Sequence, residues 1–280
     1  MARKEAGMMR LRIALAVAFV IPVTPEVLAN GQKEAAEIIE KVGNTYRNAQ
    51  SYHFEAVYII ETKSEGMQIK KETLVVIAAV RPDKMRMEIK GSMMDLDTLM
   101  ISNGSTTWEY LPRLKQYTRS KGTPTTVTTK GIDSRDLATD KITYYRTWAV
   151  ALGILLPDYE NITETVNKPR LLREEAIEVD GMTVDCYVIE ADSAFPQFVT
   201  SPKTFWIDKA RYLVVRETYS TNMRGSTSSE IKQTTVFKVA SVNEPVPDTM
   251  FVFSPPVDAK QVDDFTHKGN PSQGRKKPMN

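Results

Sequence analysis

The sequence has 280 residues, of which 41% are hydrophobic and 26% are charged. This is an ordinary globular composition, sufficient for one large domain or two small ones. A net charge of +2 implies no strongly basic face, which argues against a protein that binds nucleic acid. The single cysteine, Cys186, excludes an intramolecular disulfide and any metal site with several cysteine ligands. We interpret it as a half-buried strand residue.

The N-terminus has the pattern of an export signal. Basic residues precede an apolar run over residues 13–21, which is too short to span a bilayer. Small residues then occupy the positions expected before a cleavage site. We therefore predict a signal peptide over residues 1–29, cleaved after Ala29, and an exported protein. An uncleaved membrane anchor is the alternative, and Pro22 and Pro25 disfavour it because they interrupt the apolar run.

A helix is predicted over residues 32–49, where apolar side chains recur at three- and four-residue spacing. From residue 51 the period changes to two, which is typical of strands with one buried face. Asn103-Gly104 lies between two extended segments and predicts a hairpin with a type I′ turn, which needs positive φ at both central residues. The predicted strands cover residues 51–61, 68–80, 84–90, 96–102, 106–111, 114–119, 162–166, 171–179, 182–191, 203–208, 213–220 and 229–242.

A second helix is predicted in the middle of the strand series. A Thr-rich loop over residues 120–131 leads into it, and the helix covers residues 133–156. Because much of its circumference is apolar, we expect it to pack on the open face of the sheet. Residues 252–256 are predicted to end the ordered fold, within a single domain over residues 30–263. A disordered basic tail follows over residues 264–280.

The order of these pieces resembles that of the LolA/LolB-like family of bacterial lipoprotein-sorting carriers and their relatives among periplasmic sensors. The resemblance rests on four segments: EIIEKVGNTYRNAQSYHFEAVY, NGSTTWEYLPRLKQYT, TFWIDKARYLVVRETY and FVFSPPVDAKQVD. It implies a periplasmic protein that is mainly β with α, built as a curved, incompletely closed antiparallel β-barrel covered by helices. In this family the apolar interior receives acyl chains. The chain is longer than the small carriers, and no arginine here matches their lid-gating arginine.

The residues carry no catalytic motif. The two histidines, His53 and His267, have no partner at metal-ligand spacing, and we interpret both as structural or exposed. The sequence contains neither a nucleophile elbow nor a phosphate-binding glycine motif. Asp95 and Asp97 are better explained as a solvated turn than as a metal loop. We therefore predict a protein that is not an enzyme and has no catalytic residue, no metal site and no cofactor.

Apolar residues supply the candidate site instead. Methionine thioethers and aromatic rings adapt to ligands of varied shape, so these side chains can together line a cavity, although each one alone is better explained as core. A half-closed barrel covered by a helix is a geometry that can leave such a cavity. The predicted lining residues are Met85, Met87, Ile89, Trp108, Tyr110, Trp148, Leu152, Phe205 and Trp206.

These observations predict a periplasmic lipid or lipoprotein carrier that holds acyl chains in an apolar cavity for transfer toward the outer membrane. The expected partners are acyl chains, an inner-membrane donor complex and an outer-membrane acceptor, with no nucleic acid, and the expected state is a monomer. The alternative is a sensor or adaptor of the same fold that binds a protein partner in envelope stress regulation. A third hypothesis, a periplasmic hydrolase, requires an activity that is lost when His53 is mutated.

Overall fold

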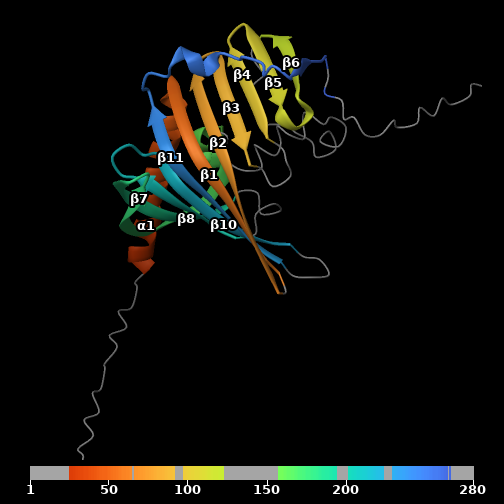
Figure 1. Ribbon diagram of the computed structural model, residues 1–280. Helices are drawn as coiled ribbons and strands as arrows, with labels where there is room; N and C mark the ends of the chain where they lie inside the picture. The colour runs from red at the N-terminus through yellow and green to blue at the C-terminus, as the bar shows by residue number, and fades with distance from the viewer. Residues whose placement is uncertain are drawn as a thin grey trace, which may run out of the picture.

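The computed structural model describes residues 25–64, 66–91, 97–122, 157–193, 201–223, 229–263 and 265. These residues form one curved, open sheet of twelve strands with helices against it (Figure 1). The helices are α1 (Pro25–Asn48), α3 (Pro157–Glu160) and α4 (Ile162–Thr165), with 3-10 turns η1 (Pro112–Leu114) and η3 (Asp248–Phe251). The strands are β1 (Ser51–Ser64), β2 (Met67–Val80), β3 (Lys84–Lys90), β4 (Thr98–Asn103), β5 (Thr106–Leu111), β6 (Gln116–Lys121), β7 (Val166–Val179), β8 (Met182–Ser193), β9 (Lys203–Asp208), β10 (Val214–Met223), β11 (Ser229–Val242) and β12 (Lys260–Gln261).

The sheet consists of two antiparallel meanders, which join where β1 pairs with β11. The strand order is β12-β6-β5-β4-β3-β2-β1-β11-β10-β9-β8-β7, so β1 pairs with β2 on one side and with β11 on the other. All of these pairs are antiparallel except β12 with β6. The alternation of apolar and polar residues along the strands suits such a sheet, because it leaves one face of each strand to be buried. The predicted mainly β fold is confirmed.

The main core lies between α1 and one face of the sheet, which we call the helix face; the other is the outer face. The apolar stripe of α1 is buried against β7 and against Phe54 and Val214 of the sheet. Tyr46, near the end of the helix, is 1% exposed and stacks on Phe54. A register shift in β10 directs the Val214 N–H to the Tyr46 hydroxyl, at 3.2 Å. The buried residues of the stripe are Ala35, Ile38, Ile39, Val42 and Tyr46.

The predicted strand over residues 162–166 is wrong. Ile162–Thr165 form helix α4, and β7 begins only at Val166. The β-branched residues of this segment favour a strand by propensity. The helical turn instead buries Ile162, which is 1% exposed, in the core beneath α1. Tertiary packing therefore outweighs the local preference.

The hairpin at Asn103-Gly104 is confirmed, but the predicted turn type is wrong. Gly104 has a φ of 93°, whereas Asn103 is not among the described residues with positive φ. The Asn103 side chain explains the difference. Its Oδ1 accepts hydrogen bonds from the N–H groups of Ser105, at 3.0 Å, and Thr106, at 2.9 Å. This Asx turn closes the loop without a left-handed backbone at Asn103.

The ordered fold also continues past the predicted end at residues 252–256. Lys260–Gln261 form β12 beside β6, because the Lys260 N–H donates to the Lys115 carbonyl at 2.8 Å and the Val262 N–H donates to the Tyr117 carbonyl at 2.9 Å. The predicted helix over residues 133–156 and most of the predicted tail lie outside the described residues. Helix α1 begins at Pro25, upstream of the predicted cleavage site. Within the described ranges, none of the helices has the length and apolar character needed to span a membrane.

The hydrogen bond from the Val214 N–H to the Tyr46 hydroxyl predicts that removing the Tyr46 hydroxyl destabilises the protein more than removing the Tyr52 hydroxyl. Tyr46→Phe leaves the buried Val214 N–H without an acceptor, and we expect the free energy of unfolding to fall by about 1–3 kcal/mol. Tyr52→Phe is the control, because no hydrogen bond of the Tyr52 hydroxyl is found among the described residues, and we expect it to change stability by less than about 0.5 kcal/mol. Urea denaturation measures both. Equal losses contradict the role assigned to the Tyr46 hydroxyl.

Candidate functional site

The helix face carries a wide apolar area that reaches from β1 to β4. Cross-strand pairing joins its members: Ile77 lies opposite Met87, and Met87 lies opposite Met100. In the next row, Val75 lies opposite Ile89. All belong to the main core cluster or pack against it. We call this area the apolar zone, and it consists of Phe54, Ala56, Val75, Ile77, Met85, Met87, Ile89 and Met100.

Four of the predicted site residues come together on this face. Met87 and Ile89 are buried in the apolar zone, and Met85 is half-buried beside them. Phe205, on β9, belongs to the same core cluster and is 2% exposed. Met85, Met87 and Ile89 share the helix face, as the alternation of β3 predicts, and Phe205 lies on the same face in the C-terminal half of the sheet.

Three others lie on the outer face. Trp108 and Tyr110 of β5 alternate with the buried Thr107 and Leu111, so their rings point away from the helices. There they contact Phe253 of the C-terminal segment, with ring centroids 6.1 Å and 6.3 Å apart. The sequence-based set therefore does not line one cavity, and these two rings form a separate aromatic cluster with the C-terminal segment.

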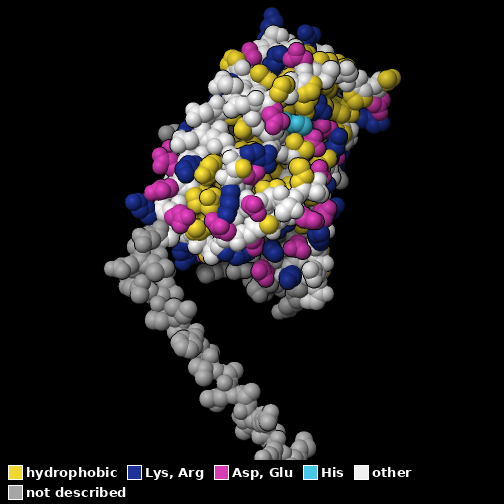
Figure 2. Space-filling model, turned by 90° about the vertical axis from the view of Figure 1, so that its left-hand side faces the viewer, with side chains coloured by type: hydrophobic (Ala, Val, Ile, Leu, Met, Phe, Trp, Pro, Cys, Tyr) yellow, Lys and Arg dark blue, Asp and Glu magenta, His cyan; other side chains and the backbone are white. Residues whose placement is uncertain are grey.

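Trp206 is also on the outer face, because it neighbours Phe205 on the same strand. The Arg216 guanidinium lies 5.4 Å from the centre of its ring, and its indole N–H donates to Glu175. On the side of the molecule where α1 and β7 lie, hydrophobic side chains reach the surface between basic and acidic ones (Figure 2). The two remaining predicted residues, Trp148 and Leu152, lie outside the described residues.

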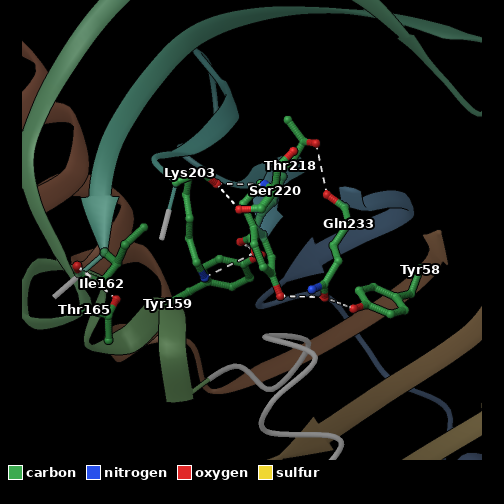
Figure 3. Close-up of polar contacts among 11 residues, drawn as sticks. Tyr58, Tyr159, Ile162, Thr165, Lys203, Thr218, Ser220 and Gln233 are labelled. Carbon is green, nitrogen blue, oxygen red and sulfur yellow. Dashed lines mark hydrogen bonds and ion pairs between the residues drawn. The ribbon is translucent and has the colours of Figure 1, made fainter. Parts of the chain in front are cut away.

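A polar cluster interrupts the helix face beside the apolar zone. Its centre is Glu217 of β10, which is only 2% exposed. The Tyr159 hydroxyl of α3 donates to Glu217 Oε2 at 3.0 Å, and the Lys203 ammonium of β9 lies 3.4 Å from Oε1 (Figure 3). A buried carboxylate is costly unless it is paired and hydrogen-bonded. Here both oxygens have partners, so the cluster holds a compensated charge.

Gln233 of β11 extends the cluster across the sheet. Its Oε1 accepts hydrogen bonds from the Tyr219 hydroxyl, at 2.7 Å, and from the Tyr58 hydroxyl (Figure 3). Burial raises the pKa of Tyr58, and the neighbouring Tyr219 and Glu217 raise it further. The Lys203 ammonium lies 5.0 Å from the centre of the Tyr219 ring. We call this set the polar band, and it consists of Tyr58, Tyr159, Lys203, Glu217, Tyr219 and Gln233.

The polar band was not predicted from the sequence, and β10 shows why. A register shift between Val214 and Arg216 changes which residues of this strand share a face. Glu217 consequently lies opposite Phe205 on one side and Thr235 on the other, on the helix face. The sequence signal was an acidic residue in a strand that also contains Arg216, Thr218 and Ser220, and such a residue is equally consistent with an exposed position.

Neither a metal-ligand cluster nor a histidine is found on the helix face among the described residues. No group of three or more His, Cys, Asp or Glu side chains among them could hold a metal ion. His53 lies on the outer face, with its Nε2 3.1 Å from Glu55 Oε1. The helix face therefore offers hydrocarbon contacts and hydrogen bonds, which suit non-covalent binding of a molecule with one apolar and one polar end.

Burial of the tyrosines predicts alkaline sensitivity. Burial raises the pKa of Tyr52 to about 12 and raises that of Tyr58 as well, above the ordinary value of about 10. The folded state therefore retains these protons when the unfolded chain loses them. Stability from this source is complete below about pH 10 and falls as the pH rises further. We expect Tyr58→Phe to flatten that decline by up to about 1.4 kcal/mol per pH unit in urea denaturation between pH 9 and 12. An unchanged slope contradicts this account.

Comparisons with known proteins place the chain in a family. No curated protein matches it. Among solved structures, an uncharacterised conserved protein from Thermus thermophilus is 14% identical, with 82% of this chain and 98% of that chain covered and a TM-score of 0.38. A LolA superfamily protein from Nitrosomonas europaea is 13% identical, with coverages of 78% and 97% and a TM-score of 0.28. The MucA/MucB complex of Pseudomonas aeruginosa matches at 10% identity, with 82% of this chain and 63% of that chain covered and a TM-score of 0.37.

Proteins of the group that the sequence motifs resemble thus occur among the matched structures. The family that is described as a predicted periplasmic protein (DUF2092) matches residues 35–264. This range contains every described strand and most of α1. The chain therefore belongs to this family of predicted periplasmic proteins.

Proposed function

We propose that this protein is a non-enzymatic periplasmic binding protein that holds the acyl chains of a lipid or lipoprotein on its helix face for transfer toward the outer membrane. The observation that carries the proposal is the apolar zone, a methionine-rich surface that borders the polar band on one face of the sheet. Together they match the two ends of an amphiphile. Export through a signal peptide cleaved after Ala29, a monomeric state, and donor and acceptor partners belong to the same proposal.

The methionines favour an adaptable binding surface over a core of fixed shape. Met85 and Met87 lie on β3 and Met100 on β4, two and three strands from β1, where Tyr46 of α1 stacks on Phe54. Thioether side chains are flexible and polarisable, so they can follow hydrocarbon chains of different lengths. Each buried methylene of such a chain contributes about 0.8 kcal/mol, so a ten-carbon contact gives on the order of 8 kcal/mol before ordering costs.

The polar band supports a binding role for a second reason. A buried ion pair gives little net stability compared with apolar residues of similar size, because both charges must leave water. Glu217 and Lys203 are placed beside an apolar zone that could have been continued by apolar side chains. The polar band at that position is therefore better explained by recognition of the polar end of a ligand than by packing of the core.

Native mass spectrometry of the protein purified from its own periplasm tests the proposal. We expect a bound species with the mass of a lipid or an acylated peptide, which organic extraction removes. A protein that is empty under these conditions, and that instead captures the periplasmic domain of an envelope regulator, contradicts the carrier and supports the sensor or adaptor.

A pair of near-isosteric variants tests which face binds the acyl chain. Met85→Gln places an unpaired amide in the apolar zone, and we expect the affinity for a fluorescent fatty-acyl probe to fall about fivefold to tenfold. Val57→Thr is the matched control, because Val57 is also half-buried but lies on the outer face, opposite Val236 and Leu74. We expect its affinity to stay within about twofold of the unmodified protein. Titration of the probe measures both, and equal losses in the two variants contradict the assignment.

A further inference from the structure

The polar band contains hydrogen-bond donors that no group in the described part of the chain accepts from. Both carboxylate oxygens of Glu217 have partners, and Gln233 Oε1 already accepts from two tyrosines. The Lys203 ammonium has three N–H groups, and Glu217 is the one hydrogen-bond acceptor that it has among the described residues, with the Tyr219 ring 5.0 Å away. No hydrogen-bond partner of the two N–H groups on Gln233 Nε2 is found in the described part of the chain. The band therefore presents donors and calls for a ligand that accepts hydrogen bonds.

The charge of the polar band indicates whether an anionic or an uncharged acceptor fits it better. Lys203 and Glu217 are its two charged members, and they neutralise one another at 3.4 Å. Lys71 lies in the same cross-strand row, at its far end on β2, but it is exposed and its charge is screened by solvent. A phosphate or carboxylate would have to lose its hydration beside the buried Glu217, and no described residue of the band supplies a cation that Glu217 does not already neutralise. An uncharged acceptor such as an ester carbonyl loses less.

We propose that the polar band binds the ester and hydroxyl oxygens of an uncharged glycerol ester, whose hydrocarbon chain lies on the apolar zone. The inference rests on the proposed function and names the class of polar end that the same face recognises. In this arrangement Lys203 and Gln233 donate to the ester oxygens. Tyr58, Tyr159 and Tyr219 hold the acceptors of the band and do not contact the ester.

The spacing along the sheet fits such a ligand. Tyr219 lies opposite Gln233, and Lys203 lies on the next strand with its ammonium over the Tyr219 ring. The backbones that carry the two donors are therefore two strands apart, about 10 Å. Both side chains reach Tyr219, because the Lys203 ammonium lies 5.0 Å from the centre of its ring and Gln233 Oε1 accepts from its hydroxyl. The apolar zone begins at Ala56, two residues along β1 from Tyr58, which is about 7 Å. A glycerol ester can span this boundary.

Competition among three ligands with the same oleoyl chain tests the headgroup class. The full chain is purified from the periplasm, delipidated and titrated with 1-monooleoylglycerol, oleate and 1-oleoyl-lysophosphatidylglycerol by displacement of a fluorescent fatty-acyl probe. We expect 1-monooleoylglycerol to bind about tenfold more tightly than either anionic ligand. Equal or tighter binding of oleate or the lysophospholipid overturns the headgroup assignment and leaves acyl-chain binding intact. Failure of all three to bind overturns the proposed function itself.

Glu217→Gln tests whether neutralisation of Lys203 sets the preference for an uncharged ligand. The amide keeps the shape of the side chain and an acceptor for Tyr159, but it leaves Lys203 with an uncompensated positive charge. We expect the affinity ratio of oleate to 1-monooleoylglycerol to rise about tenfold. Glu175→Gln is the matched control, because Glu175 also accepts from an aromatic ring and a cation, but on the outer face; its ratio should not change. A ratio unmoved by Glu217→Gln contradicts the inference.

Gln233→Glu tests the donors without removing the tyrosine bonds. The carboxylate can still accept from Tyr58 and Tyr219, whereas both amide N–H groups are lost. We expect the affinity for 1-monooleoylglycerol to fall about tenfold, with circular dichroism confirming the native fold. Undiminished binding by a folded Gln233→Glu protein overturns the proposed contact.

Discussion

The antiparallel pairing of β1 with β11 is the constraint on which the rest of the structure depends. It joins the N-terminal meander, which carries the methionines of β3 and β4, to the C-terminal meander, which carries Lys203 and Glu217. A register shift between Glu55 and Ala56 gives β11 one extra residue, so that both Phe237 and Ala240 lie toward the helix face. Without this pairing and its shift, the apolar zone and the polar band would not share a surface.

The two faces of the sheet have different physical roles. On the helix face, α1 and α3 bury aromatic side chains, and Tyr159 connects α3 to Glu217 by a buried hydrogen bond. On the outer face, the C-terminal segment crosses β3 and β4 through η3 and adds β12 to the edge strand β6 (Figure 1). Phe253 contacts Trp108, Tyr110 and Tyr117 along this path. These rings therefore stabilise the segment and protect a sheet edge.

A charged group inside an apolar face conflicts with the rule that cores are apolar, and such conflicts are where function is expected. Glu217 satisfies hydrogen-bonding rules only because residues from two other elements, Tyr159 of α3 and Lys203 of β9, converge on it. Stability alone gives no reason for that convergence, since a well-packed apolar residue serves a core equally well. The arrangement instead makes the two parts of the helix face chemically different, with hydrocarbon contacts in the apolar zone and hydrogen-bond donors in the polar band.

The sequence by itself determined the local structure. The period of two places strands where the structure has them, and the spacing of apolar residues gives α1, because these patterns depend only on neighbours along the chain. Asn103-Gly104 likewise marks the hairpin. Only the tertiary structure decided which residues of different strands share a face. Trp108 and Met87 are separated into two surfaces by pairing register, and Glu217 reaches the helix face through a shift in β10. Register and bulges depend on contacts between distant segments, which a pattern along one strand does not contain.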